Sequence, residues 1–209
     1  MSADLLRVRE HALEYEFFHK VDEELWRKLR EKLEFDNRRL ALAEATGIND
    51  DVVLDELVAA GISGETSMAL SLFPLVWIAW SDGHIEPDER TAILAAAEEA
   101  GHLRDSASYH MIELWLDHRP QPLLQSAWQD YVHYLAKTMP PTAFQSFEQC
   151  VLRRSRQLAD TICFRYGFHG AESAQDAVLD QIEATFRTTT VNGESHFLVG
   201  RSQLAQETH

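Results

Sequence analysis

Four carboxylates lie close together in one short segment of the sequence: Asp82, Glu86, Asp88 and Glu89. Carboxylate oxygens are ligands that Ca²⁺ and Mg²⁺ prefer, so the segment is a candidate site for a divalent cation. Carboxylates also stabilise the first turn of a helix, where they meet the positive end of the helix dipole and unpaired backbone amides. Residues 82–89 therefore allow two chemistries, cation binding and helix capping.

An EF-hand is one way to bind calcium with such a segment, and the sequence excludes it. The spacing of residues 82–89 matches the second half of an EF-hand loop. The first half of such a loop supplies oxygen ligands from its first and third positions, because Ca²⁺ takes six or more oxygens. Ile78 and Trp80 occupy those positions and cannot ligate.

Helix capping explains most of the same segment. Pro87 suits the first position of a helix, and Glu89 suits the third position of a capping box. Gly83 is expected to adopt the positive φ that ends the preceding helix. Helix capping does not account for Asp82, because a carboxylate at a helix C-terminus opposes the dipole. Asp82 either accepts bonds from backbone amides of the turn or shares a cation with Glu86 or Glu89.

A di-iron carboxylate bundle is the alternative metal chemistry. Such bundles use Glu-x-x-His pairs on facing helices. Three acid–histidine pairs have this spacing: Glu16/His19, Glu99/His102 and Asp130/His133. Gly101 is expected to end a helix within the second pair, so the first and third define the alternative hypothesis of a helical-bundle metalloenzyme. Ten His in an acidic chain produce such pairs readily by chance.

Motifs for nucleophilic or nucleotide chemistry do not occur in the sequence. It contains no Gly-x-Ser-x-Gly, no P-loop and no Gly-x-Gly-x-x-Gly. Neither Cys150 nor Cys163 has a neighbouring motif that would activate a thiolate. We therefore predict a non-catalytic protein without an organic cofactor.

The chain is strongly acidic: its 209 residues include 34 acidic and 19 basic side chains, for a formal net charge of −15. Binding to nucleic acid or to anionic lipid needs a Lys/Arg surface, so the composition argues against both. Residues 61–120, which surround the acidic segment, contain ten acidic and three basic side chains. This charge favours a cation or a basic protein surface as the ligand, and we expect a protein partner or a homodimer.

The sequence also predicts where the protein resides. No stretch approaches the roughly 18–20 uncharged residues of a membrane span, and the best candidate, residues 68–80, is too short. The first residues lack the apolar core of a signal peptide. The two cysteines do not form a disulfide framework. We expect a cytoplasmic protein without direct membrane insertion.

Helical patterns run through almost the whole chain, so the predicted fold class is all-α. Helices are expected at residues 4–45, 50–60, 65–81, 87–100, 105–117, 123–138, 142–166 and 173–187. The first segment fits either one long helix or two, because Val21 and Asp22 suit a staple and an N-cap. Pro74 is expected to kink the third helix. Residues 188–209 are expected to form a flexible tail or a small hairpin.

The residues around the acidic segment resemble a known family. Residues 74–83 read PLVWIAWSDG, residues 85–90 read IEPDER, and Ile93-Leu94 follow. This core, residues 74–94, resembles the TerB-like family, which is named for tellurite resistance and carries an A-x-x-D-G-x-x-x-x-x-E signature. The resemblance implies an all-helical bundle with two halves, an association with stress response, and a metal-binding role for Asp82 and Glu89.

The resemblance also sets the expected domains. Residues 63–187 are expected to form a TerB-like domain, residues 1–62 an N-terminal helical extension and residues 188–209 the tail. A degenerate second half is expected because residues 168–176 again connect a long helix to another one. His169 stands there in place of an acidic residue, which weakens a symmetric two-site metal model.

The N-terminal segment has a fainter resemblance to a second family. Residues 15–25 and 38–43 resemble the small zeta-type inhibitory subunits of ATP synthases. This N-terminal segment is expected to form a long amphipathic helix, which either packs on its own domain or binds in the groove of a partner. A helical regulator that docks on an ATPase-like partner is therefore a further alternative to the interaction module.

Overall fold

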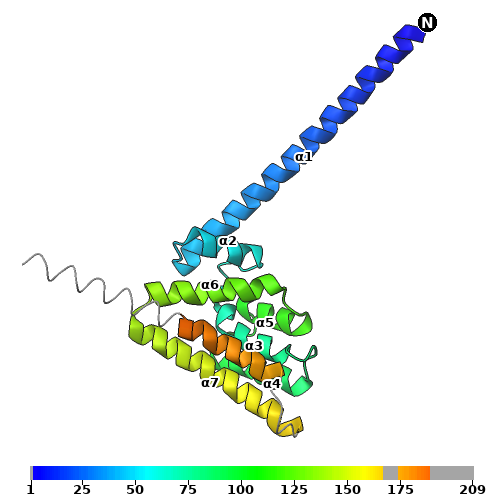
Figure 1. Ribbon diagram of the computed structural model, residues 1–209. Coiled ribbons are helices and arrows are strands. Elements are labelled where there is room, and N and C mark those ends of the chain that lie inside the picture. The colour runs from blue at the N-terminus through cyan, green and yellow to red at the C-terminus, as the bar shows by residue number, and fades with distance from the viewer. Residues whose placement is uncertain (1, 167–173, 189–209) are drawn as a thin grey trace, which may run out of the picture.

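The computed structural model describes residues 2–166 and 174–188, with side chains described for residues 19–160 and 174–188. The regular structure of this part of the chain is entirely helical, which confirms the predicted all-α fold (Figure 1). The labelled helices are α1 (Ser2–Thr46), α2 (Asp51–Ala59), the 3₁₀ helix η1 (Ser67–Ser71), α3 (Phe73–Ala79), α4 (Pro87–Glu99), α5 (Ala107–Asp117), α6 (Pro122–Thr138) and α7 (Pro141–Tyr166). Residues 174–188 form a further helix.

Helix α1 is one continuous helix and not two. Its 45 residues span about 68 Å at the α-helical rise of 1.5 Å per residue. Figure 1 shows it projecting from one end of a body that the other helices form. Among its described side chains, those near its C-terminus anchor it: Leu42 is fully buried, and Phe35 and Ala43 are partly buried against the core. Its main contact is with α2, which packs in turn on α6.

The short helix α3 lies at the centre of the body. Its residues Phe73, Leu75 and Ile78 are all buried, and α4, α5 and α7 pack around it. Trp128 of α6 is fully buried beside it, and the centroid of its ring lies 6.2 Å from that of the Phe73 ring. Since a helix that is apolar on all sides must be enclosed, the apolar run around α3 determines where the core forms.

The prediction of one kinked helix over residues 65–81 is wrong. The structure has a short 3₁₀ helix, η1, followed by α3, and Pro74 lies in the first turn of α3. Proline lacks an amide hydrogen and disfavours helical geometry in the residue before it, so it suits a helix start better than a helix interior. The backbone therefore ends one helix before Pro74 and begins another.

The ends of α2 and α4 follow local signals in the sequence. Gly61 and Gly101 adopt φ of +86° and +90° just after α2 and α4. Asp50 caps α2, because its Oδ1 accepts hydrogen bonds from the amides of Val52 and Val53 at 3.0 and 3.2 Å. Side-chain caps of this kind satisfy the unpaired amides of a first turn.

The core is continuous from the end of α1 to the helix at residues 174–188, in which Ile182 and Phe186 are fully buried. Helix α2 therefore shares its core with the predicted TerB-like domain, although it precedes residue 63. The predicted tail after residue 188, and most of the turn of the expected second half (residues 167–173), lie outside the described residues.

Candidate functional site

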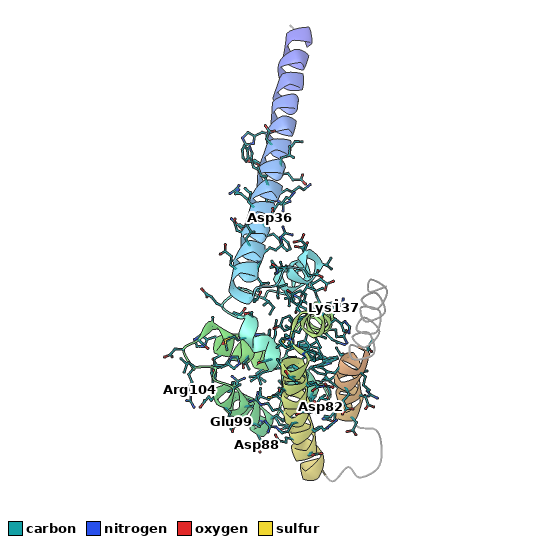
Figure 2. The ribbon with its side chains drawn as sticks, turned by 90° about the vertical axis from the view of Figure 1, so that its left-hand side faces the viewer. Asp36, Asp82, Asp88, Glu99, Arg104 and Lys137 are labelled. Atoms are coloured by element: carbon teal, nitrogen blue, oxygen red, sulfur yellow. The ribbon has the colours of Figure 1, made fainter. Side chains whose placement is uncertain are left out.

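The acidic segment forms the turn between α3 and α4 and the first residues of α4, at the end of the body remote from α1 (Figure 2). Gly83 has φ of +94°, the left-handed conformation in which side chains are strained. Trp80 anchors the turn, because its Nε1 donates a hydrogen bond to the backbone carbonyl of Trp115 at 2.8 Å. The turn is thus held by its glycine on one side and by α5 on the other.

Glu86 and Glu89 form the capping box predicted for the start of α4. The backbone amide of Glu86 donates a hydrogen bond to Oε2 of Glu89 at 2.8 Å. Pro87 lies in the first turn, where its missing amide hydrogen costs nothing. The capping interpretation of these residues is confirmed.

Asp82, which capping left unexplained, interacts within the turn. Its Oδ1 accepts a hydrogen bond from the backbone amide of His84 at 3.2 Å and lies 3.3 Å from Nδ1 of the same residue. Oε1 of Glu86 lies 3.2 Å from Nε2 of this ring. The imidazole of His84 therefore lies between two carboxylates, and its protonated form would neutralise part of their charge.

Glu89 is the buried member of the segment, with 7% of its surface exposed. Burial raises the pKa of its carboxyl above the ordinary value of 4.5, and the charges of Asp82 and Glu86 raise that pKa further. The hydrogen bond from Glu86 and the nearby His84 act in the opposite direction. Glu89 is therefore a desolvated carboxyl whose bond to the backbone holds the start of α4.

The four carboxylates predicted to bind a divalent cation lie in the turn before α4 and in its first residues, where they make the interactions of a turn and a helix cap. Within the part of the chain that the structure describes, no group of three or more His, Cys, Asp or Glu side chains is arranged to hold an ion. Asp82 and Glu86 direct oxygens at His84, Glu89 directs one at the backbone, and Asp88 is exposed on the first turn of α4. The donor set does not fit a preformed ion site in this arrangement, and cation binding at these four carboxylates stays a prediction.

The residues of the alternative di-iron hypothesis are not brought together. Asp130 and His133 lie one helical turn apart on α6, with His133 Nδ1 3.8 Å from Asp130 Oδ1. His19 lies 23 residues before Leu42, so it is about 35 Å along α1 from the anchored end. It is exposed and pairs with Glu23 at 3.4 Å. Glu16 precedes it on α1, where side chains lie outside the described residues.

Asp130 on α6 instead interacts with Glu56 on α2, a carboxyl group that the sequence analysis did not identify. A hydrogen bond with Asp130 raises the pKa of Glu56 on α2, and burial and the charge of Asp130 raise it further. Among the described residues, Oε2 of Glu56 and Nε2 of His133 are buried without a hydrogen-bond partner. The two acidic residues are 74 positions apart, so no local pattern links them.

His102 is a buried histidine just after α4, with only 3% of its surface exposed. Its Nδ1 lies 2.9 Å from Oγ of Ser108, and burial, followed by the charge of Arg154, lowers its pKa below 6.5. Ser106 lies 3.1 Å from Ser108 and caps α5 through the amide of Tyr109. This Ser–His contact is therefore part of a buried capping network.

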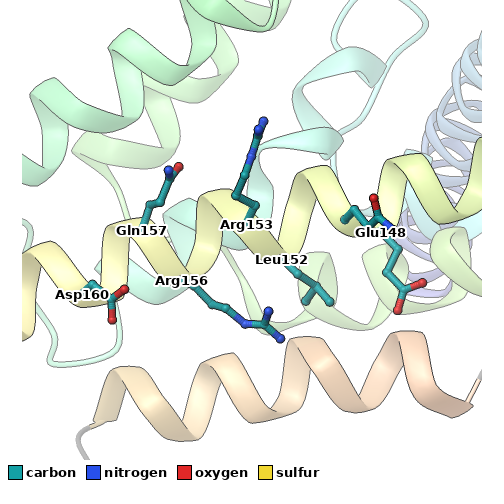
Figure 3. A pocket seen from close by; sticks show the side chains of 7 residues that line it. Glu148, Leu152, Arg153, Arg156, Gln157 and Asp160 are labelled. Atoms are coloured by element: carbon teal, nitrogen blue, oxygen red, sulfur yellow. The ribbon is translucent and has the colours of Figure 1, made fainter.

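A groove of about 440 Å³ runs along α7, which supplies all of its described lining residues. The helix at residues 174–188 lies next to α7 (Figure 3). The lining of the groove mixes charges of both signs, and Arg156 points toward the neighbouring helix, where it binds Glu183 at 2.7 Å. Arg153 points to the opposite side of α7. No residue of the acidic segment lines the groove, so it does not enclose the predicted site.

Exposed apolar side chains follow one another along α1. Among the residues whose side chains the structure describes, six large ones are exposed on this helix, and we call them the α1 stripe: Val21, Leu25, Trp26, Leu29, Leu33 and Leu40. Trp26 and Leu25 expose 63% and 59% of their surfaces. The sequence analysis anticipated an amphipathic N-terminal helix, but which of its sides stays exposed depends on the body.

Comparison with known proteins gives no match: no family model fits the sequence, and no curated protein or solved structure matches it significantly. Among the described helices, none combines the length and apolar character that crossing a bilayer requires. The resemblance of residues 74–94 to the TerB-like family therefore rests on those residues alone.

Proposed function

We propose that this chain is a non-catalytic, TerB-like helical interaction module that presents α1 to a protein partner. The observation that carries the proposal is the α1 stripe, on a helix that projects from the body and is anchored near its C-terminus (Figure 1). Exposed apolar patches of this kind mark sites of association.

The energetics of α1 support the same conclusion. Isolated helices gain little stability from their own sequence, and most helical stability comes from packing of an apolar face. The projecting part of α1 has i,i+4 ion pairs such as Glu24–Lys28 at 2.8 Å and Arg27–Glu31 at 2.9 Å. Each such pair contributes only about 0.2–0.5 kcal/mol. A partner that covers Leu25, Trp26 and Leu29 would add the missing packing.

The remaining parts of the proposal follow the sequence and the resemblance. The clustered polar side chains of the body, Glu86 with Glu89 and His102 with Ser108, act as helix caps, which suits a scaffold. We place the protein in the cytoplasm and associate it with stress response, as the TerB-like resemblance implies.

Amine cross-linking in cells followed by mass spectrometry tests the proposal. The chain has four lysines: Lys20, Lys28 and Lys32 on α1, and Lys137 on α6. Intermolecular cross-links are expected at the three α1 lysines, with Lys137 as an internal control on the body. Replacing Leu25 and Leu29 by Gln should remove these cross-links, whereas the same change at the exposed body residues Leu103 and Leu114 should not. Cross-links confined to Lys137 would overturn the proposal.

Cation binding at the acidic turn is a separate proposal, supported by the proximity of Asp82, His84 and Glu86. A bound cation would take the place of the His84 ring between the two carboxylates. Titration calorimetry with Ca²⁺, Mg²⁺, Mn²⁺ and Zn²⁺ should then give heat that Asp82→Asn combined with Glu89→Gln abolishes. No heat with any of these ions would leave the segment as a helix cap.

A further inference from the structure

The charges of α1 are divided between its two halves. Residues 2–24 contain seven acidic and three basic side chains, whereas residues 25–46 contain four acidic and six basic ones. The reversal occurs abruptly between Glu23-Glu24 and Arg27-Lys28, all of which are exposed. A helix with one acidic and one basic half is complementary to a second copy of itself in the opposite direction.

The α1 stripe lies on the side of the helix that the body leaves open. At about 100° per residue, Leu25, Leu29, Leu33 and Leu40 fall within an arc of about 80°. The anchoring residues Phe35 and Leu42 point roughly the other way on the same projection. The stripe therefore continues on the opposite side of the anchored part as far as Leu40, which is 58% exposed.

We propose that two copies of this chain associate through an antiparallel pairing of their α1 helices, with Leu25, Trp26 and Leu29 of the α1 stripe at the contact. The inference rests on the proposed role of α1 as an interaction surface, and it names a second copy as the partner. Such a contact has two-fold symmetry, so the same surface serves both copies. The helices cross near Leu25 and Trp26, where the charge reverses.

Antiparallel order follows from the charges and from the position of the body. At this crossing, Glu24 of one copy lies beside Arg27 of the other, and Glu23 lies beside Lys28. A parallel pair would place the acidic halves side by side, which is unfavourable. It would also bring both bodies to one end, whereas the antiparallel pair separates them by most of the length of α1.

The self-association of the purified full chain tests the proposal. Sedimentation equilibrium at micromolar concentration should give twice the chain mass of 23.9 kDa. Leu25→Glu with Leu29→Glu should weaken the dimer by about tenfold or more, because buried apolar side chains dominate such contacts. Leu103→Glu with Leu114→Glu, at exposed positions of the body, is the matched control and should leave the dimer intact.

Two charge-reversal variants distinguish a lost contact between the two copies from a loss of folding. Glu23→Lys with Glu24→Lys should dimerise weakly, and so should Arg27→Glu with Lys28→Glu, since each variant opposes like charges. A mixture of the two variants should restore the dimer, because each copy then meets the opposite charge. A mixture that stays monomeric while both variants keep their helical circular dichroism would overturn the antiparallel pairing.

A distance measurement tests the direction of the helices. Asn37→Cys, in a chain with Cys150→Ser and Cys163→Ser, carries one spin label per copy on the exposed side of α1. The antiparallel pair predicts labels about 35 Å apart along the helix axes, whereas a parallel pair would hold them about 10 Å apart. A monomeric chain whose α1 lysines still cross-link to other proteins would overturn the dimer and leave the interaction module standing.

Discussion

The side chain of Glu89 accepts a hydrogen bond from the backbone amide of Glu86 at 2.8 Å, and this contact ties the end of the acidic segment to the start of α4. The bond occupies one of the two oxygens of Glu89. Because Glu89 is buried, breaking the bond would leave the desolvated amide of Glu86 without a partner. The capping role of Glu89 therefore opposes any rearrangement of this carboxylate toward a cation.

Two substitutions at Glu89 distinguish the effect of its hydrogen bond on stability from the effect of its buried charge. Glu89→Gln keeps an acceptor oxygen and removes the buried charge, so it should leave the free energy of unfolding at pH 7 unchanged or raise it. Glu89→Ala removes the cap and should lower that free energy by about 0.5–2 kcal/mol. Urea denaturation followed by circular dichroism measures both, and equal losses in the two variants would contradict the capping role.

The pH dependence of this effect has a defined sign. The pKa of Glu89 is raised in the folded state, so its contribution to stability is fully present below the ordinary value of 4.5 and is lost as the pH rises through the folded pKa. Glu89→Gln should therefore remove part of the difference in unfolding free energy between pH 4.5 and pH 7.

The contact of α2 with α6 predicts a stabilising substitution. Glu56 and Asp130 are two acidic groups joined by a hydrogen bond that raises the pKa of Glu56, so the pair loses stability as the pH rises through that pKa. Asp130→Asn can donate to a charged Glu56 and should raise the free energy of unfolding at pH 7 by about 1 kcal/mol. Asp160→Asn on the exposed side of α7 is the control and should change it little. A loss in Asp130→Asn would show that the acidic pair itself stabilises the contact.

His102 predicts a loss of stability in mild acid. Its pKa is lowered in the folded state, whereas the unfolded chain takes up a proton near 6.5. The contribution of His102 is therefore present above 6.5 and is lost as the pH falls toward the lowered folded pKa. His102→Asn should reduce the difference in unfolding free energy between pH 7.5 and pH 5.5. His118→Asn, at an exposed position, should not.

Sequence patterns predicted the features that depend on neighbours in the chain. The positive φ of Gly83 and the capping box at Glu86 both act within one helical turn, so residue types and spacing were enough. Pro74 shows the limit, because one proline can kink a helix or start one. The choice depended on the surrounding core, which buries six of the seven residues of α3.

Features that join distant parts of the chain were not predictable. Glu56 meets Asp130 only because α2 packs on α6, and the buried His102 meets Ser108 of α5 and the charge of Arg154 of α7 only in the folded chain. The amphipathic character of α1 was visible in the sequence. The side of α1 that stays exposed is decided by the burial of Leu42.

The position of α1 on the body depends on one glycine. A Cβ at Gly64 would lie 2.6 Å from Cβ of Ala45 and 3.1 Å from the backbone oxygen of Ala41, both on α1. Gly64→Ala should therefore push the end of α1 away from the body and lower the free energy of unfolding by about 1–3 kcal/mol, the usual cost of overpacking. Chemical denaturation of the full chain measures the loss.

A second substitution shows whether the steric contact is the cause. Ala45→Gly removes the atom that the new Cβ would strike, although glycine in a helix costs up to about 1 kcal/mol by itself. If the contact with Ala45 is responsible, the double variant should be more stable than the sum of the two single losses predicts, as neighbouring sites are not additive. Additive losses would mean that the backbone of α1 at Ala41, and not the Ala45 side chain, sets the close approach.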